Sequence, residues 1–65
     1  MPTIKVTVPR NAWNVGEKAD IAQRLTGALA SVGEASGKGD ITPYINVHIE
    51  ETSEGGYAMG GKVIG

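Results

Sequence analysis

The chain has 65 residues, a formal net charge of −1 and no cysteine. A domain of this size buries only about 60% of the surface that its unfolded chain exposes, and it usually depends on disulfides, a metal or partner subunits. The missing cysteines exclude disulfides and thiolate metal sites, and a single histidine cannot build a zinc site unless several carboxylates converge on it. We therefore expect residues 1–65 to form one domain, without metal or cofactor, that is completed by oligomerisation.

The charge and hydropathy of the chain argue against two further classes of partner. Lys and Arg number 6 and Asp and Glu number 7, so no basic footprint for nucleic acid is present. No apolar run approaches the roughly 20 residues that a membrane span needs. The first residues lack the basic and apolar segments of a signal peptide. We predict a cytoplasmic protein that binds neither nucleic acid nor membrane.

The first predicted element is a strand from Thr3 to Val8, because apolar and polar residues alternate along it. Pro9 ends this strand, since proline has no N–H to donate to a neighbouring strand. One side of the strand is apolar and carries Ile4, Val6 and Val8. A loop from Pro9 to Trp13 follows.

The second predicted element is an amphipathic helix from about Val15 to Val32 or Ala35. Asn14 is its predicted N-cap, and Glu17 stands where a capping-box carboxylate reaches back to the cap. Glycine within a helix costs about 1 kcal/mol relative to alanine, so close packing at Gly27 would explain its presence there. The apolar stripe expected to face the sheet consists of Ile21, Leu25, Ala28, Leu29 and Val32.

A second strand is predicted from Thr42 to Glu50, with Ile45, Val47 and Ile49 on one side. The tail from Glu51 to Gly65 is rich in glycine and is expected to form a loop and a short hairpin around Tyr57 to Val63. This order predicts an α+β fold: a small βαβ subunit with a parallel two-stranded sheet, one long helix and a C-terminal hairpin.

The predicted sheet needs more than this chain to be stable. Two strands do not form an independently stable sheet. One face of the sheet is covered by the helix, and nothing in the chain covers the other face. That uncovered face carries Lys5, Thr7, Asn46 and His48. Both features predict partner subunits.

One glycine-rich segment and two single residues are candidate sites. The segment Gly56–Lys62 fits the G-x-x-x-x-G-K spacing of a phosphate-binding loop, but Val63 stands where a magnesium-binding Ser or Thr is needed. A hairpin turn with positive φ is the preferred interpretation of these glycines. His48 is expected to be structural or interfacial, with general acid–base catalysis as the alternative. Trp13 is expected to pack at an edge or subunit contact, with ligand stacking as the alternative.

The start of the chain carries a further candidate group. Pro2 follows Met1 directly, and removal of the initiator methionine would leave a secondary amine at the beginning of a strand. An exposed α-amino group has a pKa of about 7.7–8.0, and burial in an apolar pocket lowers that pKa. Such an amine is a good general base near neutral pH and can also attack carbonyls. A Met-Pro start alone does not indicate a function.

Pro2 does not stand alone. A strand after it, an arginine beyond that strand, a long helix, the segment Pro43–Glu51 and the segment Gly56–Gly61 follow in one order. In this order the chain resembles the 4-oxalocrotonate tautomerase family over essentially its whole length, most specifically in the proline at position 2 and in the aromatic followed by x-x-Gly-Gly. The resemblance implies a βαβ subunit that pairs into dimers and assembles as a homohexamer, a trimer of dimers.

The resemblance also implies a chemistry and a set of site residues. An amino-terminal proline acts as general base or acid in keto–enol or double-bond isomerisation of 2-oxo or 2-hydroxy carboxylates, which assigns Pro2 as the catalytic residue. Tyr57 stands at the position of the aromatic that lines the pocket, with an added hydroxyl. Arg10 lies close to the first carboxylate-binding arginine but out of register, because the loop here is slightly longer. Asn46 replaces a second arginine, and Met59 replaces the glutamate with which dehalogenase and hydratase relatives activate water.

The sequence therefore predicts a tautomerase or isomerase acting on an enolisable 2-oxo acid, in which Arg10 holds the carboxylate and Tyr57 and Asn46 hydrogen-bond the developing enolate oxygen. Asn46 argues against a dicarboxylate, because a charge-assisted hydrogen bond is about twice as strong as a neutral one. The alternative is a non-catalytic structural subunit of a mixed oligomer, which Asn46 favours and the retained Pro2 and Tyr57 oppose. A third hypothesis, a generic small binding module, discards the resemblance.

Overall fold

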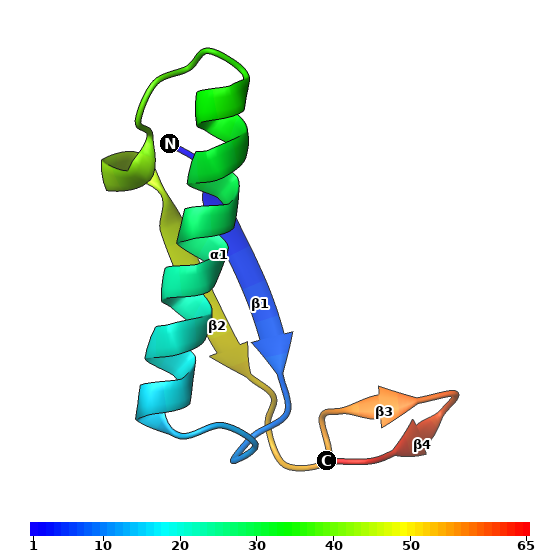
Figure 1. Ribbon diagram of the computed structural model, residues 1–65. Helices are drawn as coiled ribbons and strands as arrows, with labels where there is room; N and C mark the ends of the chain where they lie inside the picture. Colours follow the sequence, from blue (N-terminus) through cyan, green and yellow to red (C-terminus); the bar gives the residue numbers. More distant parts are fainter.

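The computed structural model describes the whole chain, Met1–Gly65. One helix lies across one face of a two-stranded parallel sheet, and a small hairpin extends from the end at which the strands finish (Figure 1). The α+β architecture, the parallel strand pair, the helix and the C-terminal hairpin confirm the predicted fold class. The elements in chain order are β1 (Thr3–Val8), α1 (Val15–Ala35), the 3₁₀ helix η1 (Thr42–Tyr44), β2 (Asn46–Glu51), β3 (Ala58–Met59) and β4 (Lys62–Val63).

The β1–β2 pair aligns apolar side chains beneath α1. Ile4 lies opposite Val47, and Val6 lies opposite Ile49, in parallel register. These four residues are half-buried, while their neighbours Thr3, Lys5, Thr7, Asn46 and His48 are exposed, as the alternation of the sequence predicted. One face of the sheet therefore packs on the helix and the other face is open.

A complete capping box starts α1. The Asn14 side-chain oxygen accepts a hydrogen bond from the Glu17 backbone N–H at 2.8 Å, and the Glu17 carboxylate accepts one from the Asn14 backbone N–H at 2.9 Å. The two contacts satisfy backbone donors that have no partner within the helix, and N-caps of this kind contribute about 1 kcal/mol. The predicted cap is confirmed, and α1 runs to the later of its two predicted ends.

The buried face of α1 differs from the prediction. Ala28 and Val32 are exposed, Val32 to 62%. Because α1 packs mainly against β2 and η1, its buried face is rotated toward Ala22, Thr26 and Ala30, while Ile21, Leu25 and Leu29 are half-buried as predicted. The half-buried residues of the stripe are Ile21, Ala22, Leu25, Thr26, Leu29 and Ala30.

The close packing expected at Gly27 occurs instead at Gly33. Nothing lies within 4 Å of the position that a Cβ on Gly27 would occupy. A Cβ on Gly33 would lie 2.8 Å from the Cδ1 atom of Ile41, closer than real Cβ contacts allow. Gly33 is buried and lets the last turns of α1 approach the segment that leads into η1.

The second strand begins later than predicted. Residues Thr42–Tyr44 form η1, and β2 starts at Asn46 and ends at Glu51. Pro43 occupies the first turn of η1, where its fixed φ fits a helical backbone and its missing N–H costs nothing. The Asp40 carboxylate accepts a hydrogen bond from the Thr42 backbone N–H at 3.0 Å, just before η1 begins. The Thr42 contacts also hold the pKa of Asp40 below its ordinary value.

This fold buries very few residues. Val8 and Gly33 are the two buried residues, and the chain is elongated, with extents of 44 × 26 × 16 Å. Helix α1 lacks the combination of length and apolar character that crossing a membrane requires. The large apolar side chains that remain exposed are Met1, Trp13, Val15, Val32, Tyr44, Met59, Val63 and Ile64.

Candidate active site

The residues assigned to the site lie at opposite ends of the β1–β2 sheet. Pro2 and Asn46 lie where the two strands begin, and Arg10 and Tyr57 lie beyond the point where they finish (Figure 1). Strand β1 has 6 residues. At about 3.3 Å per residue, such a strand separates its two ends by roughly 20 Å. One chain therefore places two of the four residues at each end of the sheet and does not bring all four together.

Pro2 is fixed at the first rung of the sheet. Its carbonyl oxygen accepts a hydrogen bond from the Asn46 backbone N–H at 2.9 Å. Pro2 itself is half-buried, whereas Met1 is 89% exposed. The Asn46 side chain is exposed and belongs to the open face of the sheet, since Asn46 alternates with the half-buried Ile45 and Val47. A nitrogen freed at Pro2 and the Asn46 amide thus share one end of the sheet.

Arg10 is already paired with a carboxylate of its own chain. Its Nη1 atom lies 3.4 Å from Oε2 of Glu54, and the side chains of Arg10 and Glu54 are 43% and 91% exposed. Glu54 belongs to the turn that leads from β2 to the hairpin, in which the Gly56 N–H donates to the Ser53 carbonyl at 2.8 Å. No local pattern predicts this pair, because 44 positions separate the two residues.

Glu51 anchors the loop that carries Arg10. Its carboxylate accepts a hydrogen bond from the Asn11 backbone N–H at 3.2 Å, and its other oxygen lies 3.2 Å from Nζ of Lys18. Asn11 has a φ of 60°, a left-handed conformation that asparagine adopts more readily than most residues. The Lys18 ammonium and the Asn11 N–H hold the pKa of Glu51 below its ordinary value. Glu51 thus joins the end of β2, the loop and the first turns of α1.

Tyr57 lies at the base of the hairpin. It is half-buried, and its carbonyl accepts a hydrogen bond from the Ile64 backbone N–H at 2.8 Å. A Cβ on Gly65 would lie 3.6 Å from Cβ of Tyr57 and 3.8 Å from Cβ of Pro9, so this last residue of the chain lies between the tyrosine and the end of β1. Tyr57 therefore belongs to the Arg10 end of the sheet.

The glycines of the phosphate-loop-like segment form a hairpin turn, as preferred from the sequence. Met59 pairs with Lys62 across β3 and β4, which leaves Gly60 and Gly61 as the two turn residues. Their φ angles are 59° and 84°. A two-residue turn with positive φ at both positions matches the right-handed twist of its strands, and glycine adopts it without steric cost.

His48 has a neighbour that the sequence did not suggest. Its Nδ1 atom lies 3.7 Å from Oε1 of Glu50, and the same oxygen lies 3.2 Å from Nζ of Lys5. Lys5 and His48 are direct partners in the β1–β2 register, so the cluster depends on strand pairing that single-strand patterns do not reveal. These three side chains lie on the open face of the sheet, and His48 is 60% exposed.

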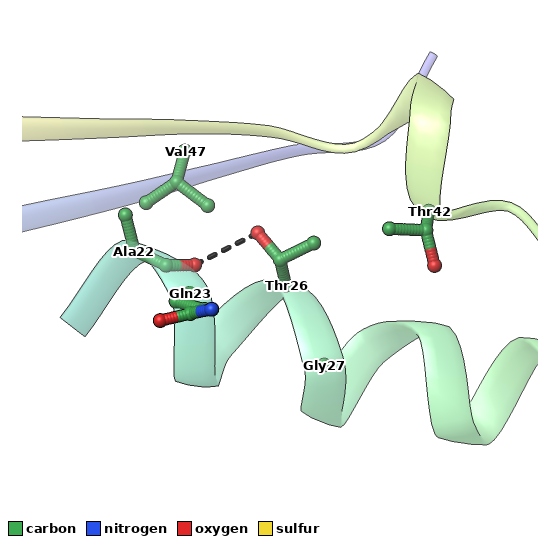
Figure 2. A pocket seen from close by; sticks show the side chains of 6 residues that line it. All are labelled: Ala22, Gln23, Thr26, Gly27, Thr42 and Val47. Atoms are coloured by element: carbon green, nitrogen blue, oxygen red, sulfur yellow. Dashed lines mark hydrogen bonds between the residues drawn. The ribbon is translucent and has the colours of Figure 1, made fainter. Parts of the chain in front are cut away.

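A shallow groove of about 530 Å³ lies between α1, η1 and β2 (Figure 2). Within its lining, the Thr26 hydroxyl donates to the Ala22 carbonyl at 2.8 Å. No charged side chain and none of the assigned site residues line it. The lining residues are Ala22, Gln23, Thr26, Gly27, Thr42 and Val47. The groove therefore has no side chain that could act as a general acid or base.

No group of three or more histidine, cysteine, aspartate or glutamate side chains converges in a way that could hold a metal ion. Trp13 lies in the loop before α1 and is 41% exposed, so its expected packing at a subunit contact stays a prediction. No family model, curated protein or solved structure matches this chain. A function for this chain is therefore argued from its residues and their geometry.

Proposed function

We propose that the protein is a tautomerase-like isomerase that moves a proton on an enolisable 2-oxo or 2-hydroxy acid, with the amine of Pro2 as general base. The observation that carries the proposal is the position of Pro2. Its carbonyl is hydrogen-bonded to the start of β2, while Met1 is 89% exposed. Removal of Met1 would free the amine of a residue that the sheet holds in place.

The proposed reaction needs one proton acceptor and two kinds of hydrogen-bond donor. The neutral Pro2 amine takes a proton from the carbon next to the substrate carbonyl, and the electron pair of that C–H bond forms the enolate. The phenol of Tyr57 and the side-chain amide of Asn46 donate to the enolate oxygen, where negative charge develops. The protonated proline then returns its proton to oxygen or to a different carbon. Arg10 holds the carboxylate throughout.

The proposal requires an oligomer of this chain, since the two halves of the site lie at opposite ends of the sheet. Two copies related by a two-fold axis perpendicular to the sheet run their strands in opposite directions. The Pro2 end of one copy then lies beside the Arg10 and Tyr57 end of its partner. The open sheet face, the small core and the exposed apolar residues of the hairpin, Met59, Val63 and Ile64, support further contacts between dimers. We assign the complete assembly as a homohexamer, a trimer of dimers.

The substrate that suits these residues carries one carboxylate. Arg10 is the one cation among the assigned site residues, and Asn46 offers neutral hydrogen bonds in place of a second charge. Met59 has no group that activates water, so the proposal includes isomerisation and leaves out hydration and dehalogenation. A 2-oxo monocarboxylate meets these conditions.

One observation favours the alternative, a structural subunit that keeps the assembly without catalysis. The guanidinium of Arg10 already contacts the carboxylate of Glu54.

Proton exchange distinguishes the two functions. Incubated in D₂O with a series of 2-oxo monocarboxylates, an isomerase exchanges the hydrogens next to the carbonyl, which proton NMR detects as loss of signal. No exchange above the buffer rate for any of these acids, from protein whose mass shows Pro2 as its first residue, would favour the structural subunit.

Assembly is tested separately by light scattering at micromolar concentration. The expected mass is six times the 6.7 kDa of one chain. A folded monomer would contradict the proposed site, because one chain does not bring Pro2 and Arg10 together.

A further inference from the structure

We propose that Glu54 is a built-in competitor for the carboxylate-binding arginine: its side chain occupies Arg10 and thereby sets how tightly a substrate carboxylate binds. This inference rests on the proposed function, in which Arg10 holds a 2-oxo acid. It goes beyond that function because it assigns a role in substrate affinity to a residue outside the catalytic and binding set.

The contact has the geometry of a displaceable pair. A single distance of 3.4 Å joins Nη1 of Arg10 to Oε2 of Glu54, so the guanidinium is engaged at one nitrogen only. A substrate carboxylate can form two parallel hydrogen bonds with a guanidinium, which is the stronger arrangement. Both side chains are accessible, with Arg10 exposed to 43% and Glu54 to 91%. An incoming carboxylate can therefore reach the nitrogen atom that Glu54 contacts.

Glu54 is not needed to hold the loop in place. Glu51 does this by binding the Asn11 backbone N–H and the Lys18 ammonium, each at 3.2 Å. The Glu54 side chain has Arg10 as its one hydrogen-bonding and ion-pair partner. A carboxylate that makes no second contact contributes little to the fold. It competes with any other carboxylate that binds Arg10.

The size of the effect follows from the exposure of the pair. Exposed ion pairs are weak, and the loss of one changes an equilibrium by about two- to five-fold. We therefore expect Glu54→Gln to tighten carboxylate binding at Arg10 by about that factor. The substitution keeps the size of the side chain and removes its charge, so a change in loop packing is not expected.

The experiment measures binding and does not depend on turnover. Pyruvate, the simplest enolisable 2-oxo acid, is titrated into the wild-type protein and Glu54→Gln, and the Nε–Hε NMR signal of Arg10 reports the Kd. Glu34→Gln is the matched control, because it also removes one negative charge but lies near the end of α1 and forms no ion pair. The expected result is a Kd lower by two- to five-fold in Glu54→Gln and equal to wild type in Glu34→Gln.

Two results would overturn the inference, and they separate it from the proposed function. Equal affinity of the wild-type protein and Glu54→Gln for pyruvate at Arg10 removes the role of Glu54 and leaves the carboxylate-binding role of Arg10 intact. A signal of Arg10 that pyruvate leaves unchanged in both proteins removes both roles. Exchange of the pyruvate hydrogens in D₂O, followed in the same samples, shows independently whether the protein catalyses proton transfer.

Discussion

The carbonyl oxygen of Pro2 and the backbone N–H of Asn46 are joined by a 2.9 Å hydrogen bond that closes the amino-terminal end of the sheet. The bond comes from the backbone, so it does not depend on the side chain at position 46. It fixes residue 2 relative to β2 through the carbonyl of Pro2, while the nitrogen of Pro2 forms the peptide bond to Met1. The proposed chemistry requires cleavage of the peptide bond between Met1 and Pro2, because only cleavage leaves a free amine.

Two glycines of α1 are expected to respond oppositely to alanine. Gly27→Ala meets open space and should stabilise the protein by up to about 1 kcal/mol, because alanine favours helix over glycine. Gly33→Ala brings a methyl group against Ile41 and should be destabilising by about 1–3 kcal/mol, as overpacked sites usually are. Urea unfolding of both variants checks the difference. Equal stabilities would mean that the end of α1 does not approach Ile41.

The stability of the protein is expected to fall in acid through Glu51. Lys18 and Asn11 lower the pKa of this carboxyl in the folded state from its ordinary value of 4.5. A lowered folded-state pKa adds stability above the unfolded value and loses it as the pH falls through the folded value. Wild-type protein should therefore lose stability below about pH 4.5 more steeply than Glu51→Gln, by thermal unfolding at a series of pH values. Identical slopes would show that the Glu51 contacts do not form in solution.

Substitution of Arg10 tests the carboxylate site by kinetics. Arg10→Ala should raise KM more than it lowers kcat, because the carboxylate contact is equal in the ground state and the transition state. Hydrogen bonds to charged groups contribute about 1.5–3 kcal/mol, which corresponds to roughly a 10- to 100-fold rise in KM. Arg24→Ala is the control, since Arg24 pairs with Asp20 on the surface of α1. If both variants kept wild-type kinetics, Arg10 would be an ordinary loop arginine.

Local patterns predicted the parts of the fold that depend on neighbouring residues. Alternation identified β1, and the spacing of Asn14 and Glu17 identified the start of α1 and its capping box. The pattern failed where tertiary packing decides. Val32 continues the helical stripe in sequence but is exposed, because α1 packs toward β2 and η1. Pro43 argues against a strand at Thr42–Tyr44, since proline fits a helical first turn better than the interior of a sheet.

The site was less predictable than the fold. The sequence indicated Pro2, Arg10, Asn46 and Tyr57 one by one, but their division between two ends of the sheet needed the strand order. The contact of Arg10 with Glu54 joins residues 44 positions apart and has no local signal. The sharing of Glu50 between Lys5 and His48 depends on strand register. Long-range contacts of this kind follow from the fold, and no motif encodes them.

The central claim is that the free amine of Pro2 moves the proton, and one comparison tests it directly. Protein whose mass shows Pro2 as its first residue is assayed beside protein that keeps a residue before Pro2, on the 2-oxo monocarboxylate that the first form turns over fastest. Blocking converts the amine to an amide, which cannot accept a proton. Since a positioned general base contributes about 10²–10⁴-fold, we predict a loss of kcat/KM of at least about 100-fold. The free form should show a basic limb that titrates between about pH 6 and 7.5, below an exposed α-amino group. Turnover by the blocked protein at the rate of the free form would contradict the account and make His48, with Glu50 beside it, the leading candidate for the base.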